Sequence, residues 1–148
     1  MKWTISGSSH LDEVLALLAG DRQVYALERL ANGTYRLVQA DTWQPGQHTL
    51  GEYRQTEPLK ALFFPAREFI GRWGEPVGRE PMPERIVFGV KNCDLSSLAI
   101  FDHVFLDGAD KDTYYAEARD KTILVSSDCS SQLDVCFCPV VGEQPYAR

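Results

Sequence analysis

The chain has 148 residues, of which 44% are hydrophobic and 24% charged, a composition that is typical of one globular domain and argues against disorder. Its formal net charge of −6 argues against broad binding to nucleic acid or to an anionic membrane surface. The N-terminal residues lack the apolar stretch of a secretory signal, and no apolar run is long enough to span a bilayer. We therefore expect a cytoplasmic protein, whose cysteines stay reduced.

The first part of the chain predicts a helix followed by a β-hairpin. Apolar side chains in residues 11–18 cluster on one side of a helix whose first turn holds Asp12-Glu13 and whose stop is Gly20. Residues 24–27 and 35–38 resemble strands, and the Asn-Gly pair between them is a strong hairpin signal.

Four segments connect this hairpin to the rest of the chain. Residues 41–56 are polar and rich in Gly and Gln, which predicts a loop. An apolar patch follows over 58–64, and residues 67–73 are expected to form a short helix. Residues 74–84 contain three prolines, so we expect a connector there.

The remainder of the chain predicts a strand–helix–strand unit. Residues 85–90 form a nearly continuous apolar run, as expected of a strand covered on both faces. A helix capped by Asp94 or Ser96 follows, then a short helix over 110–119 and a second buried strand over 122–126. Strand, helix and strand in this order predict a crossover connection between parallel strands.

These elements predict an α/β fold, namely a small, mostly parallel sheet with flanking helices, preceded by a helix and a β-hairpin. We expect a single domain over residues 1–148. Within it, residues 1–57 form a helix-and-hairpin subregion and residues 58–148 form an α/β subregion that carries all the cysteines.

The four cysteines, Cys93, Cys129, Cys136 and Cys138, are the informative feature of the sequence. Cys93 and Cys129 each follow a predicted strand, so both are expected at the carboxyl edge of the sheet, where parallel sheets bind ligands. Cys136 and Cys138 lie close enough in the chain to fold back onto the same edge. We expect each of the four on a loop.

Four converging thiols in a reducing compartment indicate metal or redox chemistry. A cubane iron–sulfur cluster takes four thiolate ligands, but this spacing matches neither a bacterial ferredoxin run nor a zinc ribbon. The spacing alone therefore leaves three interpretations open, which are an iron–sulfur cluster, a zinc site and buried structural or redox cysteines. Lys91, Asn92, Ser126, Ser127 and Ser130 can supply polar contacts to such a site.

Other chemistry has weaker support. A Cys93–His103 hydrolase is disfavoured because the neighbouring Asp94 raises the thiol pKa. A flavin or nucleotide site at the same sheet edge lacks a glycine-rich fingerprint.

Several segments together resemble a known family. They are Pro58-Leu59-Lys60-Ala61-Leu62-Phe63-Phe64-Pro65, Phe88-Gly89-Val90-Lys91-Asn92-Cys93-Asp94-Leu95, Asp112-Thr113-Tyr114-Tyr115, Asp128-Cys129 and Val135-Cys136-Phe137-Cys138. This pattern is similar to the iron–sulfur beta subunit of cytoplasmic nickel–iron hydrogenases (sulfhydrogenases) and to the A subunit of anaerobic sulfite reductase. The resemblance covers the chain from about Pro58 to its end.

The resemblance implies a [4Fe–4S] cluster held by Cys93, Cys129, Cys136 and Cys138. Zinc is the alternative cofactor, which the cysteine spacing leaves open. It also implies a non-catalytic relay of electrons between a flavin- and NAD(P)-binding subunit and a catalytic subunit. In the family such a domain precedes a dicluster ferredoxin module, and residues 1–148 contain no run of that kind. The rival from another functional class is a structural zinc domain that serves in docking.

Overall fold

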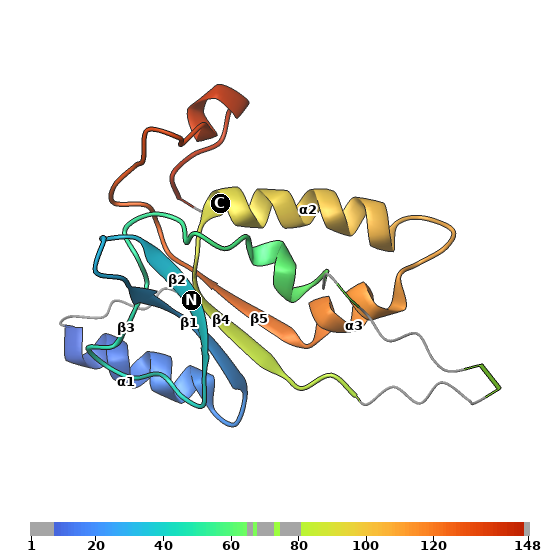
Figure 1. Cartoon of the computed structure of the whole chain (residues 1–148), viewed down its shortest axis with the longest axis horizontal. Coiled ribbons are helices and arrows are strands. Elements are labelled where there is room, and N and C mark those ends of the chain that lie inside the picture. The colour runs from blue at the N-terminus through green and yellow to red at the C-terminus, as the bar shows by residue number, and fades with distance from the viewer. Residues whose placement is uncertain (1–7, 65–66, 68–72, 75–80, 147–148) are drawn as a thin grey trace, which may run out of the picture.

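The computed structural model describes residues 8–64, 67, 73–74 and 81–146 (Figure 1). In this described part of the chain, three α-helices and five strands form an α/β fold, as predicted from the sequence. The elements are α1 (Ser8–Ala19), β1 (Gln23–Arg29), β2 (Tyr35–Ala40), β3 (His48–Thr49), β4 (Arg85–Val90), α2 (Asn92–Leu106), α3 (Thr113–Asp120) and β5 (Thr122–Ser126), with 3₁₀ helices at Leu59–Leu62 and Cys138–Val141. No helix in the described part of the chain has the length and apolar character needed to cross a membrane.

The sheet has the strand order β2-β1-β4-β5, and β3 pairs with β1. Strands β1, β4 and β5 run parallel, whereas β2 and β3 are antiparallel to β1. The parallel pairing of β4 with β5 across α2 and α3 confirms the predicted crossover. Because β1 pairs directly with β4, the helix-and-hairpin subregion and the cysteine-bearing subregion share one sheet.

Helices cover both faces of the sheet (Figure 1). On one face, α1 packs its Leu15 and Ala19 against Ile86 and Phe88 of β4. On the other face, α2 and α3 pack against Val87 and Val90, which extends a second buried cluster to the 3₁₀ turn at Leu59–Leu62. Burying apolar side chains on both faces explains why every residue of β4 is buried.

The N-terminal elements follow the sequence closely. Helix α1 begins at Ser8, one turn before the predicted start, so Asp12-Glu13 lies beyond its first turn. It ends at Ala19, and the predicted stop, Gly20, follows in the left-handed conformation with φ +52°. The predicted hairpin is confirmed, with Gly33 at φ +84° in its turn.

Three expectations need correction or lie outside the described residues. Strand β3 falls inside the predicted 41–56 loop. Strand β5 is an edge strand with only Thr122 buried, whereas its apolar sequence predicted burial on both faces. The helix predicted over 67–73 and most of the connector over 74–84 lie outside the described residues.

Candidate metal centre

A β-bulge sets the direction in which the chain leaves β4. Pairing between β4 and β5 shifts register between Phe88 and Val90, so Gly89 is an extra residue in the ladder. Phe88 faces the α1 cluster and Val90 faces the α2 cluster, although strict alternation would place both on one face. Gly89 has φ +81°, and a Cβ there would lie 2.8 Å from the Leu50 carbonyl oxygen. The bulge therefore requires glycine, and it sets the direction of the residues that follow β4.

The residues after β4 and β5 carry two of the four cysteines. Cys93 lies in the first turn of α2, which begins at Asn92, so the prediction that it sits on a loop was wrong. The cap of α2 is Lys91 and not Asp94 or Ser96. Cys129 follows the end of β5 at Ser126 in an irregular segment, as expected. Both residues lie past the carboxyl ends of adjacent parallel strands, which is where ligands of such sheets bind.

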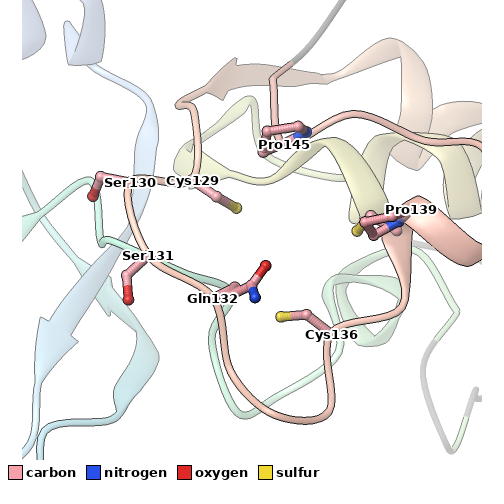
Figure 2. Close-up of a pocket in the computed structure, with 8 residues that line it drawn as sticks. Cys129, Ser130, Ser131, Gln132, Cys136, Pro139 and Pro145 are labelled. Carbon is pink, nitrogen blue, oxygen red and sulfur yellow. The ribbon is translucent and has the colours of Figure 1, made fainter.

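Three of the cysteines line one cavity of about 360 Å³. Figure 2 shows the sulfur atoms of Cys129 and Cys136 projecting into this space from opposite sides. The other residues of the lining are Ser130, Ser131, Gln132, Cys138, Pro139 and Pro145. The segment after Cys129 thus returns to the sheet edge and brings Cys136 and Cys138 to the same space as Cys129.

Cys93 lines a second cavity, of about 370 Å³, together with Phe137, Arg54 and Asp94. The charges of Cys138 and Cys129 both raise the pKa of the Cys93 thiol, so Cys93 lies within electrostatic reach of two of the other cysteines. In the described parts of the chain, however, no three His, Cys, Asp or Glu side chains are close enough to hold a metal ion. The structure brings the four thiols to one sheet edge without placing them in ligating geometry.

Burial disfavours the thiolate forms of Cys93 and Cys129. It raises the pKa of the Cys93 thiol to about 12, with further increases from Asp94 and Cys138 and a decrease from Arg54. Burial also raises the pKa of Cys129, which the positive charge of Lys91 opposes. All four cysteines are half-buried and none forms a disulfide. A metal ion that binds here must displace protons, since thiolates are the ligands.

Hydrogen bonds rather than apolar packing hold the cysteine-bearing segment in place. The Cys129 amide donates to the Pro145 carbonyl at 2.8 Å, and the Asn92 side chain donates to the Gln144 carbonyl at 2.9 Å. At Cys136, the amide donates to Leu133 O, while the Leu133 amide donates to the Cys136 sulfur at 3.2 Å. An N–H···S bond of this kind stabilises thiolate ligands and tunes bound metal groups.

Two charged side chains near Cys93 were not singled out as site residues from the sequence. Asp94 is 5% exposed, and its Oδ2 has no hydrogen-bond partner among the residues that the structure describes. Burial raises the pKa of Asp94, and the charges of Arg54 and Lys91 lower it. Arg54 comes from the loop after β3 and reaches this region only through folding, which no local sequence signal encodes.

Comparisons with known proteins give one relative. No family model matches the chain, and no solved structure matches it. The chain is 26% identical over 144 residues to sulfhydrogenase 2 subunit beta of Pyrococcus furiosus, an alignment that covers 96% of this chain. This chain is similar to a hydrogenase beta subunit. The similarity confirms the resemblance seen in the sequence and extends it to the N-terminal helix and hairpin. The chain spans 42% of the length of that relative.

The residues present fit a metal group of the kind that the hydrogenase beta-subunit resemblance implies. The donor set is chemically right, because thiolates are the soft ligands that iron–sulfur clusters and zinc take. The N–H···S bond at Cys136 and the positive charge of Lys91 near Cys129 both favour thiolates. The geometry is incomplete, because Cys93 lines a separate cavity from the other three. Ligation therefore requires the segment after Cys129 to close toward α2.

Proposed function

We propose that this chain is an electron-transfer domain of an iron–sulfur oxidoreductase subunit that holds one [4Fe–4S] cluster through Cys93, Cys129, Cys136 and Cys138. The observation that carries the proposal is that Cys129, Cys136 and Cys138 line one cavity after the end of β5, while Cys93 lies in the first turn of α2, after the end of the adjacent β4. Similarity to a hydrogenase beta subunit supports the same assignment. When bound, such a cluster accepts and releases one electron at a time without making or breaking substrate bonds.

In this function, the protein itself would bind the cluster, shield it from water and hold it in a fixed orientation. Cys93 lies in the first turn of α2, whereas the other three thiols lie on the segment that follows β5. Pro139 and Pro145 give the cavity an apolar lining that limits water. Val135 and Val140, which flank the last two cysteines, are 75% and 87% exposed. The centre therefore lies near the surface, where electrons can pass to another protein.

The proposal includes partners and a compartment. We infer that the domain relays electrons between a flavin- and NAD(P)-binding subunit and a catalytic subunit, in the cytoplasm, as a non-catalytic component of a redox complex. The name of the relative describes one subunit of a sulfhydrogenase, which supports a role within an assembly. The half-buried, unpaired thiols are consistent with a reducing compartment.

The test is anaerobic reconstitution with iron and sulfide, followed by metal and sulfide analysis. We expect about four iron and four sulfide per wild-type chain, with the brown colour of a cubane cluster. The double variant Cys136→Ala/Cys138→Ala should lose most of both, because two of the four ligands are gone. Ser131→Ala is the matched control, since Ser131 lines the same cavity and carries no thiol. It should retain the wild-type content.

Other outcomes would identify a different function. A colourless wild-type protein with one zinc per chain would replace the cluster with the structural zinc alternative. A yellow protein that releases flavin on denaturation, and still does so when all four cysteines are alanine, would show that the sheet edge binds a flavin.

A further inference from the structure

Lys91 carries a charged side chain that is completely buried, at 0% exposure. The three N–H donors of its ammonium group are shared among four acceptor oxygen atoms, namely Leu50 O at 3.1 Å, Gly51 O at 2.8 Å, Ser127 Oγ at 2.7 Å and Asp128 O at 3.2 Å. A buried lysine is costly unless such contacts satisfy its donors, so this position is built for an amino group.

The surroundings of Lys91 match the charged, ammonium form. All four of its partners accept hydrogen bonds, and the Ser127 hydroxyl directs its own proton to Leu50 O at 2.9 Å. A neutral amine would point its lone pair at one of these oxygen atoms, which is unfavourable, whereas an ammonium group has only donors. Among the described residues, no carboxylate forms an ion pair with Lys91. Its positive charge is therefore not neutralised by direct contact.

The backbone contacts of Lys91 connect its charge to the cysteines of the candidate metal centre. Lys91 precedes Cys93 by two positions, and its Nζ binds the carbonyl of Asp128, the residue immediately before Cys129. It thereby joins the backbones that carry two of the proposed ligands. Burial lowers the pKa of Lys91, and the negative charges of Cys129, Asp128 and Cys93 oppose this effect in decreasing order.

We propose that Lys91 supplies the fixed positive charge that compensates the thiolate ligands of this metal centre, so that it strengthens metal binding and raises the reduction potential. This inference rests on the proposed function. Four thiolates around a metal group give the site a net negative charge, and one-electron reduction adds another. A buried cation stabilises both states through a medium of low dielectric, and stabilises the reduced state more. Lys91 is a positioning residue and not a ligand.

Cobalt(II) titration of the metal-free chain tests this role, because thiolate coordination of cobalt gives a charge-transfer absorption. We expect Lys91→Met to weaken cobalt binding about 10- to 100-fold, the range found when outer-shell partners of metal sites are removed. Lys91→Gln keeps a hydrogen-bond donor but removes the charge, so it should also weaken cobalt binding. Far-UV circular dichroism and thermal unfolding establish that each variant folds.

Ser127→Ala is the matched control, because it removes one of the four hydrogen bonds to Lys91 and leaves the charge in place. If Lys91 acts through its charge, Ser127→Ala should bind cobalt within about threefold of the wild type. If Lys91 only clamps the loops, Ser127→Ala should weaken binding as well, and Lys91→Gln should be milder than Lys91→Met. That second pattern would overturn the proposal.

The reduction potential of the reconstituted protein is the second readout, which a purely structural role would not move. We expect Lys91→Met to lower the ratio of reduced to oxidised centre about tenfold at a fixed potential, equivalent to a midpoint about 59 mV lower for a one-electron couple. An unchanged midpoint in a variant that retains its metal would refute the role of Lys91 alone. A wild-type chain that takes up neither cobalt nor iron would refute the proposed function and this inference with it.

Discussion

Strand β4 and the segment over residues 127–146 meet at one edge of the sheet and are held in different ways. All six residues of β4 are buried between helices on both faces. In the segment, large apolar side chains such as Val135 and Val140 are exposed, and the contacts to the sheet are mostly hydrogen bonds to the backbone. The sheet thus has its full core without a metal, whereas the segment gains little from apolar burial. We expect metal binding to increase the local stability of the segment much more than that of the sheet.

The largest expected effect is on the sheet. Phe88 is fully buried and packs edge-on against Trp43, with ring centroids 5.2 Å apart. Phe88→Ala should lower the free energy of unfolding by about 3–5 kcal/mol, because it removes apolar contacts and leaves a cavity. Val140→Ala in the exposed segment should change it by less than about 0.5 kcal/mol. Urea denaturation of both metal-free variants measures the difference, and equal losses would contradict the comparison.

The second prediction concerns the segment itself. Chymotrypsin should cleave the metal-free chain after Phe137, whose side chain is half-exposed beside two cysteines. At a free metal concentration of one hundred times Kd, cleavage should slow about 100-fold, because it tracks the population of the opened segment. Electrophoresis and mass spectrometry of timed samples measure the rate.

Cys136→Ala provides the control for this experiment. Its cleavage after Phe137 should be as fast as in the metal-free wild type and should respond little to added metal. Protection of this variant equal to that of the wild type would mean that the metal binds elsewhere or that the segment is ordered independently of the thiols.

The third prediction tests the bulge that joins the two regions. Gly89→Ala should cost about 2–3 kcal/mol, because the new Cβ combines a left-handed backbone with contacts at 2.8 Å to Leu50 O and 2.9 Å to Leu27 Cδ1. Gly33→Ala has a similar φ of +84° and nothing within 4 Å of the new Cβ, so it should cost only about 1 kcal/mol. Thermal unfolding of both variants separates steric contact from backbone strain.

The difference between the two regions also explains what the sequence could predict. The apolar run of β4, the Asn-Gly turn and the order of strand, helix and strand are local signals, and each predicted its element correctly. The bulge at Gly89 and the edge position of β5 depend on pairing between distant strands. Local patterns do not encode such pairing, so β5 was expected to be more buried than it is.

At the cysteine centre, too, local sequence patterns predicted the strand order but not the contacts between distant residues. Topology alone predicted that Cys93 and Cys129 follow adjacent parallel strands, and the structure shows both past those strand ends. The start of α2 at Asn92, which places Cys93 in a helix, was missed because Asp94 and Ser96 are the stronger capping residues by sequence. The complete burial of Lys91 was also not predictable, because its partners Leu50 and Ser127 are far away in the chain.

The smallest expected effect is at the opposite end of α2 from the cysteines. The Asp102 carboxylate accepts hydrogen bonds from Arg119 Nε and NH2, each at 2.8 Å, and from the Tyr115 hydroxyl at 2.7 Å. These contacts tie α2 to α3 toward the end of α2 that lies away from Cys93. Asp102→Asn should lower the free energy of unfolding by about 1 kcal/mol at pH 7, a value that allows for the partial solvent exposure of the pair.

The pH dependence of this loss follows from the same contacts. The bonds from Arg119, and then the bond from Tyr115, hold the pKa of Asp102 below its usual value of 3.8. A carboxylate with a lowered pKa in the folded state stabilises the protein fully above the pKa of the unfolded chain and loses this effect as the pH falls through the folded value. The difference between wild type and Asp102→Asn should therefore be constant from pH 7 to about pH 5 and shrink below about pH 4. In an Arg119→Met background, Asp102→Asn should cost less at pH 7 and show a weaker dependence on pH. An undiminished loss there, measured by denaturation across this range, would assign the effect to packing and not to the ion pair.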